Sequence, residues 1–505
     1  MLMRLTKAVS RKTWLLGKRI TTLLAVATLA IVLGFTTYAV SMLPPLQPWH
    51  TDRLHEEFSA LRHGDLDFAG YLQREDKLFA ELRETVACWD SANELFRTSR
   101  FNPSSMSSRL VDGSPYNRSF RLTQAKPRGQ ALLIHGLTDS PYSMKALASS
   151  LHTRGFEVTV LRLPGHGTLP SMLTEMSVRD WSAAVSIAAH DVAGRATGGQ
   201  PFYIGGYSTG GTLSLQYTLD ALEDASLRRP DRVLLLSPAI ELTKVAALAS
   251  IIDALSILPI PVLEKVRWQE ISQEYDPYKF NSFPVNASRQ INRATKELQK
   301  SLQHASEAGR LAQMPPVVTW QSVVDSTVGA IGVADRLYAK LPGAKHRLVL
   351  FDVNRARELA GVLLPQTAAL VERLKGSPRA YTLEIVGNSS PEADSANVSI
   401  YHHAPDGALS VRDSGLAWPA SLVSLGHVAL PFAPDDPVYG FIPGSGHNGI
   451  PSIGSWLLRG ESGAVSISLS ALTRLRSNPF WSLIDADIGE LVAADLGAVS
   501  TQSKR

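Results

Sequence analysis

Short apolar runs alternate with helical patterns through the middle of the chain. Six runs rich in Val, Ile and Leu follow one another: QALLIHG (130–136), FEVTVLRLPG (156–165), PFYIGGYS (201–208), RVLLLSP (232–238), PVVTWQSVVD (316–325) and HRLVLFDV (346–353). Helical spacing of apolar positions lies between them, as in residues 143–155 and 179–194. This alternation is typical of a mostly parallel sheet with helices on both faces. The pattern therefore predicts an α/β fold.

Two stretches depart from the simple alternation. Residues 240–314 separate the fourth apolar run from the fifth and have a mostly helical pattern, which predicts an insert. Beyond the sixth run, the segments TLEIVG, VSIYHH and ASLVSLGH predict additional strands or loops. We expect one domain over residues 116–505 that contains this insert and an extra C-terminal segment, residues 436–505.

The residues before this domain follow a different pattern. Apolar positions recur at helical spacing through residues 50–98 among Arg, Glu and Asp. Residues 101–115 are polar and rich in turn-forming residues. Residues 44–115 are therefore predicted to be a helical extension followed by a linker.

An uncharged apolar stretch occupies residues 20–43. As a helix it extends about 36 Å, enough to cross a hydrocarbon core of about 30 Å. Six basic residues and no acidic residue precede it. The positive-inside rule then places residues 1–19 in the cytoplasm and the domain on the extracytoplasmic side, which in a bacterium is the periplasmic side of the inner membrane. The alternative is a cleaved secretory signal, with residues 39–41 as the cleavage site.

Composition narrows the class of protein. Hydrophobic residues make up 44% and charged residues 19% of the 505 residues, which is ordinary for a globular protein. The net charge of +4 depends on the N-terminus, because without its six basic residues 44 basic residues face 46 acidic ones. We therefore expect no nucleic-acid partner. The single cysteine, Cys88, excludes an intramolecular disulfide and a cysteine-rich zinc site.

The segment GYSTG (206–210) matches a nucleophile elbow. Such a motif places a serine on a sharp turn between a strand and a helix, so that its oxygen projects at the carboxyl end of the sheet. Glycines two positions before and after the serine let the backbone make this turn. The apolar run PFYIG precedes the motif and the helical pattern GTLSLQYTLDAL follows it. Ser208 is therefore the candidate nucleophile, and an ordinary strand–turn–helix joint is the alternative.

Two backbone amides are candidates for an oxyanion hole. The segment LIHGL ends an apolar strand with an open turn, and Thr209 follows the candidate nucleophile. The N–H groups of Leu137 and Thr209 are therefore expected to face an oxyanion beside Ser208. His135 in this segment, and His166 in RLPGHGT, are interpreted as histidines that shape their loops.

The acid and base of a catalytic triad are expected after the nucleophile, at the ends of later strands. Asp325 closes the run PVVTWQSVVD and is the candidate acid, with a helix N-cap as the alternative. His427 ends the apolar stretch ASLVSLGH, enters a loop and is the candidate base. His447, in GSGHNG, is the rival. The remaining histidines of this region lie at the start of a strand or within one: His346, His402 and His403.

Taken in order, the segments IHGLTDSPYSM, RLPGHGTLP, GYSTG and SLGHV resemble the α/β-hydrolase superfamily. Within it they are similar to the monoacylglycerol lipase, carboxylesterase and serine aminopeptidase-like branch, and the resemblance covers residues 125–435. It implies that Ser208 is the nucleophile, Asp325 the acid and His427 the base. One feature departs from the family pattern, because His427 follows Asp325 by 102 positions and compact members place the base much sooner.

The resemblance also implies an activity. We expect a membrane-anchored serine hydrolase that cleaves carboxylic esters through an acyl-enzyme, with the oxyanion held by the amides of Leu137 and Thr209 and without a metal or organic cofactor. The expected partner is a small acyl ester or lipid-like substrate, and the insert is expected to cap its acyl chain with apolar residues such as Ile251 and Leu255. A serine peptidase of the same fold and a non-catalytic, membrane-tethered binding protein are the alternatives.

Overall fold

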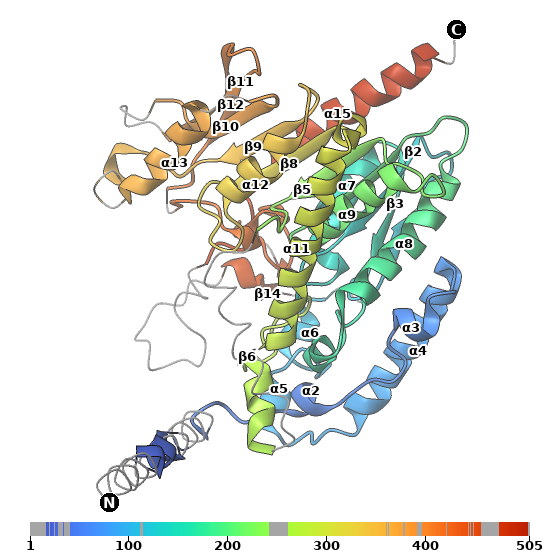
Figure 1. Ribbon diagram of the computed structural model, residues 1–505, viewed down its shortest axis with the longest axis vertical. Coiled ribbons are helices and arrows are strands. Elements are labelled where there is room, and N and C mark those ends of the chain that lie inside the picture. Colours follow the sequence, from blue (N-terminus) through green and yellow to red (C-terminus); the bar gives the residue numbers. More distant parts are fainter. Residues whose placement is uncertain are drawn as a thin grey trace, which may run out of the picture.

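The computed structural model describes residues 41–502 except 112–114, 242–260, 360, 362, 377–378, 391–395, 421, 443, 445, 448 and 456–473, together with residues 17–19, 21–24, 26–28 and 34. Its centre is a ten-stranded sheet (Figure 1). The strands are β1 Phe120–Leu122, β2 Gly129–Ile134, β3 Phe156–Leu161, β4 Phe202–Tyr207, β5 Arg232–Leu236, β8 Val317–Ser322, β9 Arg347–Phe351, β10 Thr382–Asn388, β11 Asn397–His403 and β12 Leu409–Ala417. Their spatial order is β1-β3-β2-β4-β5-β8-β9-β10-β11-β12.

The middle of the sheet is parallel. Neighbouring strands from β3 to β10 run in the same direction, whereas β1 at one edge and β11 and β12 at the other are antiparallel to their neighbours. The six predicted runs correspond to β2, β3, β4, β5, β8 and β9, so the predicted mostly parallel sheet is confirmed. The carboxyl ends of these strands meet at one edge, where ligand sites of parallel sheets form.

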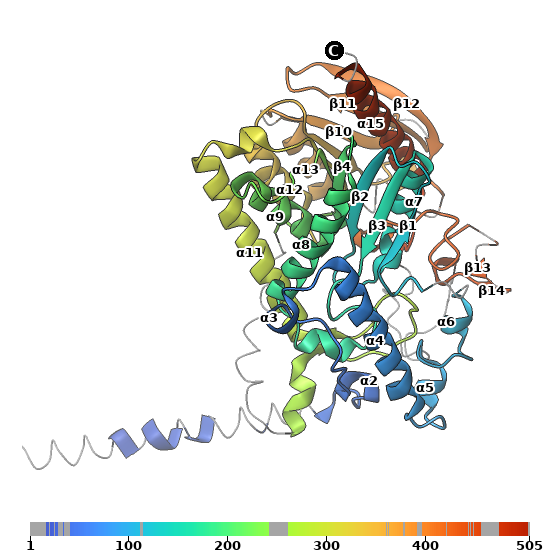
Figure 2. The same ribbon diagram turned by 90° about the vertical axis from the view of Figure 1, so that its right-hand side faces the viewer.

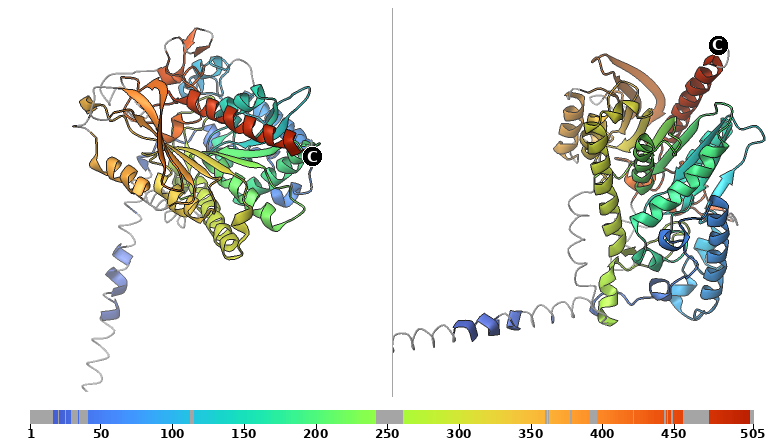
Figure 3. Two further views of the ribbon diagram at one scale, coloured as in Figure 1. Left: turned by 90° about the horizontal axis from the view of Figure 1, so that it is seen from above. Right: turned by 45° about the vertical axis from the view of Figure 1, so that its right-hand side comes forward.

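Helices cover both faces of the sheet. One face packs on α4 Phe68–Ala87, α8 Val178–Arg195, α9 Thr209–Glu223, α11 Val285–Glu307, α12 Ala330–Arg336 and α13 Pro365–Gly376, and the other on α7 Lys145–Thr153 and α15 Trp481–Gln502. Figure 3 shows α15 crossing one face with α11 on the opposite side. Leu132 and Ile134 of β2 join the first core, while Ala131 and Leu133 join the second. Because both faces are covered, the apolar run of β2 is continuous.

The segments beyond β9 extend the sheet. TLEIVG and VSIYHH lie in β10 and β11, whereas residues 422–426 of ASLVSLGH are an irregular segment that leads into a 3₁₀ turn, η8 His427–Ala429. After it come the short ribbon of β13 Gly446–His447 and β14 Ile450–Pro451, and then α15. The candidate base therefore follows the three added strands.

The described part of the predicted insert is built around α11. A 3₁₀ helix, η4 Pro261–Arg267, and a ribbon of β6 Trp268–Glu270 and β7 Phe283–Pro284 precede α11, and η5 Arg310–Gln313 follows it. Ile291, Ala294 and Leu298 on one face of α11 are buried in the core shared with α8 and α9. This helix therefore belongs to the helical layer over the sheet. The apolar positions expected to contact an acyl chain, which include Ile251 and Leu255, lie outside the described residues.

The N-terminal extension packs on the domain. It contains α4 and four short helices: α2 Pro48–Thr51, α3 Ala60–His63, α5 Glu94–Arg97 and α6 Met106–Arg109. Figure 2 shows α2, α4 and α5 together at one end of the molecule. The stretch expected to be a linker, residues 101–115, contains the short helix α6. The Ser105 side chain caps this helix by accepting a hydrogen bond from the Ser108 N–H, which stabilises its first turn.

The stretch predicted to span a membrane, residues 20–43, lies mostly outside the described residues. Among the residues that are described, no helix has both the length and the apolar character needed to cross a bilayer. The membrane anchor therefore stays a prediction from the sequence.

Candidate active site

Ser208 lies on a sharp turn between β4 and α9. Its backbone has φ 53° and ψ −114°, a conformation that residues other than glycine rarely adopt. A Cβ on Gly206 would lie 2.3 Å from the Gly210 carbonyl carbon, so the turn requires glycine there. The Ser208 N–H donates to the Leu236 carbonyl and its carbonyl accepts from the Ala239 N–H, each at 3.0 Å. The backbone is thus held on both sides of a strained turn, as a nucleophile elbow requires.

The loop after β2 lies against the first turn of α9. A Cβ on Gly210 would lie 2.0 Å from the Ile134 carbonyl oxygen, so only glycine permits this approach. The approach brings Leu137 and Thr209 to the same end of the sheet. In the described part of the chain, neither of their backbone N–H groups donates to another backbone group. Both donors are therefore available to an oxyanion.

Asp325 follows β8 and binds His427. Its Oδ2 lies 2.7 Å from His427 Nδ1, and its Oδ1 accepts from the backbone N–H groups of Thr327 and Val328, each at 2.9 Å. Burial alone would raise the pKa of the Asp325 carboxyl, but His427 and these N–H groups hold it below its usual value. The ionised carboxylate therefore fixes the proton on Nδ1 and leaves Nε2 of the ring as the proton acceptor.

His427 lies beside the strand end that carries Ser208. The hydroxyl of Tyr207, the residue before Ser208, donates to the His427 carbonyl at 3.2 Å, and the two ring centroids are 5.0 Å apart. The Ser322 hydroxyl at the end of β8 donates to the Leu425 carbonyl at 2.7 Å. These contacts tie the irregular segment before η8 to β4 and to β8. The structure thus places the predicted base, His427, against Asp325 after β8 and against Tyr207 at the end of β4, next to Ser208 in the chain.

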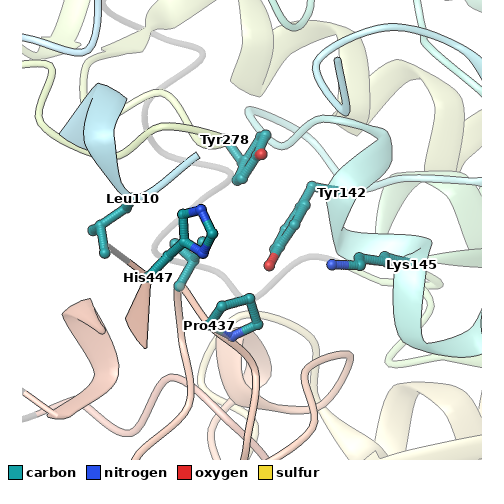
Figure 4. Close-up of a pocket in the computed structure, with 7 residues that line it drawn as sticks. Leu110, Tyr142, Lys145, Tyr278, Pro437 and His447 are labelled. Atoms are coloured by element: carbon teal, nitrogen blue, oxygen red, sulfur yellow. The ribbon is translucent and has the colours of Figure 1, made fainter. Parts of the chain in front are cut away.

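The other candidate histidines lie elsewhere. His447, the rival base, lines a small cavity together with Leu110 of the extension, Tyr142 and Tyr278 (Figure 4). His402 and His403 lie on β11, an antiparallel strand outside the parallel part of the sheet. Among the described histidines, only His427 is hydrogen-bonded to Asp325.

His135 and His166 shape the loops beside the site, as expected. His135 donates from Nδ1 to the Gly136 carbonyl at 2.8 Å and accepts at Nε2 from the Leu163 N–H at 3.0 Å. Burial lowers the pKa of His135 well below its usual value and lowers the pKa of His166 to about 3. The two rings pack edge to face with centroids 4.9 Å apart. Both histidines are therefore uncharged and hold the backbone of their loops.

Two side chains near the site were not predicted from the sequence. Asp139, two residues after Leu137, accepts a hydrogen bond from Lys279 Nζ at 2.7 Å. Burial raises the pKa of Asp139, and Lys279 opposes this effect. Asp139 stands in the segment IHGLTDSPYSM, but Lys279 lies 140 positions later in the insert. No local pattern connects the two residues.

Candidate metal ligands do not gather in the described part of the chain. No group of three or more histidine, cysteine, aspartate or glutamate side chains there is arranged to hold an ion. The histidines at the site bind carboxylate or backbone groups instead, as His427 binds Asp325 and His135 binds Leu163.

Comparisons with known proteins agree with the fold. Residues 125–352 match the family described as serine aminopeptidase, S33. A thermostable monoacylglycerol lipase of Bacillus sp. (strain H-257) is 37% identical over 84 residues, which are 17% of this chain and 32% of that protein. The chain thus matches about a third of the length of this curated relative. The two likenesses confirm the predicted resemblance to the lipase and esterase branch of the α/β-hydrolases. The family match includes Ser208 and Asp325 and ends before His427.

Solved structures give more distant likenesses. A metagenome-derived lipolytic enzyme, from a study of LipS and LipT, is 19% identical with a TM-score of 0.38, and the match covers 47% of this chain and 89% of that one. A soluble variant of monoglyceride lipase from Saccharomyces cerevisiae is 15% identical with a TM-score of 0.35, over 46% and 81% of the two chains.

Proposed function

We propose that this protein is a membrane-anchored serine hydrolase that cleaves carboxylic esters. The observation that supports this most directly is the hydrogen bond of 2.7 Å between Asp325 and His427, beside the strained turn of Ser208. A buried carboxylate that orients an imidazole next to a serine on a strained turn is the arrangement with which serine hydrolases activate their nucleophile.

In the proposed reaction, His427 accepts the Ser208 proton as the serine Oγ attacks the acyl carbon. Asp325 keeps the imidazole in the required tautomer and stabilises the imidazolium that forms. The N–H groups of Leu137 and Thr209 stabilise the negative charge on the carbonyl oxygen. His427 then protonates the leaving alcohol, and water hydrolyses the acyl-enzyme by the same sequence of proton transfers.

An ester is favoured over a peptide as the substrate. The curated relative is described as a monoacylglycerol lipase, which supports a small acyl ester or lipid-like molecule as the substrate class. A peptidase is the second candidate, because the matching family is described as serine aminopeptidase. A non-catalytic binding protein would be expected to lack one of the catalytic groups, whereas Ser208, Asp325 and His427 are all present.

The anchor is proposed from the uncharged residues 20–43 and the basic residues before them. At the end of this stretch the Leu43 carbonyl accepts a hydrogen bond from Lys265 Nζ at 2.7 Å, which links it to η4. The hydrolase domain is then on the extracytoplasmic side of the inner membrane. Protease added to spheroplasts is expected to digest the domain, and the mature protein is expected to keep its N-terminus. A mature N-terminus at or beyond Val40 would contradict the anchor.

A fluorophosphonate probe tests the catalytic part of the proposal. Full-length protein in detergent is expected to be labelled on the peptide that contains Ser208, and Ser208→Ala is expected to lose the label. Ser226→Ala, which alters an exposed serine at the end of α9, is the matched control and keeps it. In a panel of acyl esters and aminoacyl amides, the esters are expected to turn over faster. A folded protein without label would refute the hydrolase, and faster turnover of the amides would favour the peptidase.

A further inference from the structure

A short segment of the insert contacts the loop that carries Leu137. The Lys279 ammonium donates to Asp139 Oδ1 at 2.7 Å, and the Phe280 N–H donates to the Thr138 carbonyl at 2.8 Å. Both partners directly follow Leu137 in the chain. The Asp139 side chain is only 7% exposed, so the ion pair is shielded from solvent on the side of the loop. The insert thus holds the loop by one charged and one backbone contact.

The loop needs such support because its backbone is strained. Thr138 has φ 63°, and a β-branched residue rarely adopts this conformation. Strained backbone of this kind persists only where the surrounding structure enforces it. A Cβ on Gly136 would lie 2.7 Å from Asp139 Oδ2, so the carboxylate packs directly on the residue before Leu137. A shift of the Asp139 carboxylate therefore shifts the backbone that presents the Leu137 N–H.

The insert segment is itself held in place. Asp276 Oδ1 accepts from the backbone N–H groups of Tyr278 and Lys279, each at 3.1 Å, and also from the hydroxyl of Tyr439. The Tyr278 ring stacks on Tyr142, with centroids 3.9 Å apart and planes within 3° (Figure 4). Tyr142 belongs to a 3₁₀ helix, η1 Pro141–Met144, that leads into α7. The C-terminal segment and η1 therefore support the segment that carries Lys279.

We propose that Lys279 is a positioning residue that holds the Leu137 N–H in place for the oxyanion, through its ion pair with Asp139. This inference rests on the proposed function. It gives the insert a role in the chemistry itself, in addition to any contact with the substrate. The geometry required is narrow, since donors must lie within about 2.7–3.1 Å of the oxyanion to stabilise it.

Kinetics of Lys279→Met test the role in turnover. Because a displacement of about 1 Å can cost on the order of 100-fold in rate, we expect kcat on a short acyl ester to fall at least about tenfold, with KM changed less than about threefold. The affinity for a boronic acid analogue of the tetrahedral intermediate is expected to fall in parallel. Lys279→Arg is expected to restore most of the kcat and most of this affinity. Lys375→Met, in the exposed pair of Lys375 with Glu372 on α13, is the matched control and keeps wild-type kinetics. A rise in KM at unchanged kcat would overturn the proposal and assign Lys279 to substrate binding.

Two further measurements keep the proposal testable if one variant folds poorly. Asp139→Asn and the double variant are expected to lose about as much kcat as Lys279→Met alone, since all three break one ion pair. If the losses of the two single variants multiplied in the double variant, the two residues would act independently and the proposal would be overturned.

Hydrogen exchange of the peptide covering residues 133–145 is expected to be faster in Lys279→Met than in the wild type and in Lys375→Met. This readout does not depend on activity, so unchanged exchange would refute the positioning role whether or not the protein is an esterase.

Discussion

The N-terminal extension (residues 44–115) and the C-terminal addition (residues 353–505) both lie outside the family match, and they join the domain by different interactions. Besides apolar contacts such as those of Phe58 and Tyr71 with the core, the extension joins the domain through buried charges. Arg162, after β3, donates to both carboxylate oxygens of Glu57, at 2.9 and 3.1 Å, and to Glu75 of α4 at 3.1 Å. All three side chains are at most 3% exposed. Buried charges are tolerated only when paired in this way.

The C-terminal addition joins the domain through an apolar stripe with charges at its rim. Ile484, Ile488 and Val492 are buried at helical spacing on one side of α15, in the core that also contains α7. Three aspartates of α15 pair with arginines of the domain, at more accessible positions: Asp485 with Arg154, Asp487 with Arg347 and Asp495 with Arg232.

The difference matters for the site. Glu57 accepts from the Gly165 N–H at 2.9 Å, and Arg162 donates to the His166 carbonyl at 3.0 Å, so the buried charges hold the loop that packs against His135. The C-terminal addition instead supplies His427 itself. The extension therefore supports the shape of the site, whereas the addition contributes the proposed base. The following substitutions separate the two contributions.

The largest expected effect is on the base. His427→Ala is expected to lower ester turnover by about 10⁴-fold or more while the protein stays folded, because serine is a poor nucleophile without a proton acceptor. His447→Ala and His403→Ala are expected to keep at least about a tenth of the activity, since a histidine that takes no part in the chemistry affects it only through stability. Circular dichroism of each variant shows that it is folded. If His447→Ala were folded but inactive while His427→Ala stayed active, the base would be His447 in the C-terminal segment and not His427.

The next effect is on the buried charges of the extension. Glu57→Gln leaves Arg162 buried with only part of its charge balanced, and we expect the free energy of unfolding to fall by about 3–5 kcal/mol. Glu56→Gln, which alters the neighbouring and more accessible pair with Arg74, is the control and is expected to change the free energy of unfolding by less than about 1 kcal/mol. Urea unfolding with matched m-values measures both. Equal effects of the two substitutions would show that the buried pair does not attach the extension.

The apolar stripe of α15 is tested by removing one side chain. Ile488 is fully buried, and Ile488→Ala is expected to lower the free energy of unfolding by about 2–5 kcal/mol through lost burial and the cavity left behind. Glu490→Ala, on the exposed side of the same helix, is expected to change stability by less than about 0.5 kcal/mol. If Glu490→Ala were the more damaging of the two, the attachment of α15 would not be apolar.

Local patterns account for what the sequence predicted. The strands β2, β4 and β8 lie in short runs rich in apolar residues, and the residues that follow them stand at their carboxyl ends, so Ser208 and Asp325 could be chosen as candidates from short segments. The assignment of His427 was less direct, because an irregular segment carries it and three added strands precede it. Its hydrogen bond to Asp325 depends on a chain path that no local pattern encodes.

Pairs of residues far apart in the chain could not be predicted. Glu57 is one of 46 acidic residues and lies 105 positions from Arg162, and nothing in the neighbouring sequence distinguishes it from the half-buried Glu56. The pairing of Lys279 with Asp139 is hidden in the same way, since a lysine in a helical pattern normally faces solvent. Periodicity predicts which face of an element is buried, but which charge is buried with which depends on the tertiary fold.

The smallest expected effect is on the rim of α15, and it sharpens the contrast with the extension. Asp485 binds Arg154 at 2.8 Å, and its side chain is 43% exposed. Asp485→Asn is therefore expected to lower the free energy of unfolding by less than about 1 kcal/mol, and about 1 M salt is expected to screen most of this loss.

The hydrogen bond from Arg154 lowers the pKa of Asp485. The stabilisation is therefore present above the unfolded pKa of about 3.9 and is lost as the pH falls through the folded value. Thermal unfolding of both proteins at pH 7 and pH 3, with and without salt, measures the difference. A loss at pH 7 as large as that of Glu57→Gln, unchanged by salt, would mean that the C-terminal addition is held by buried charge as well.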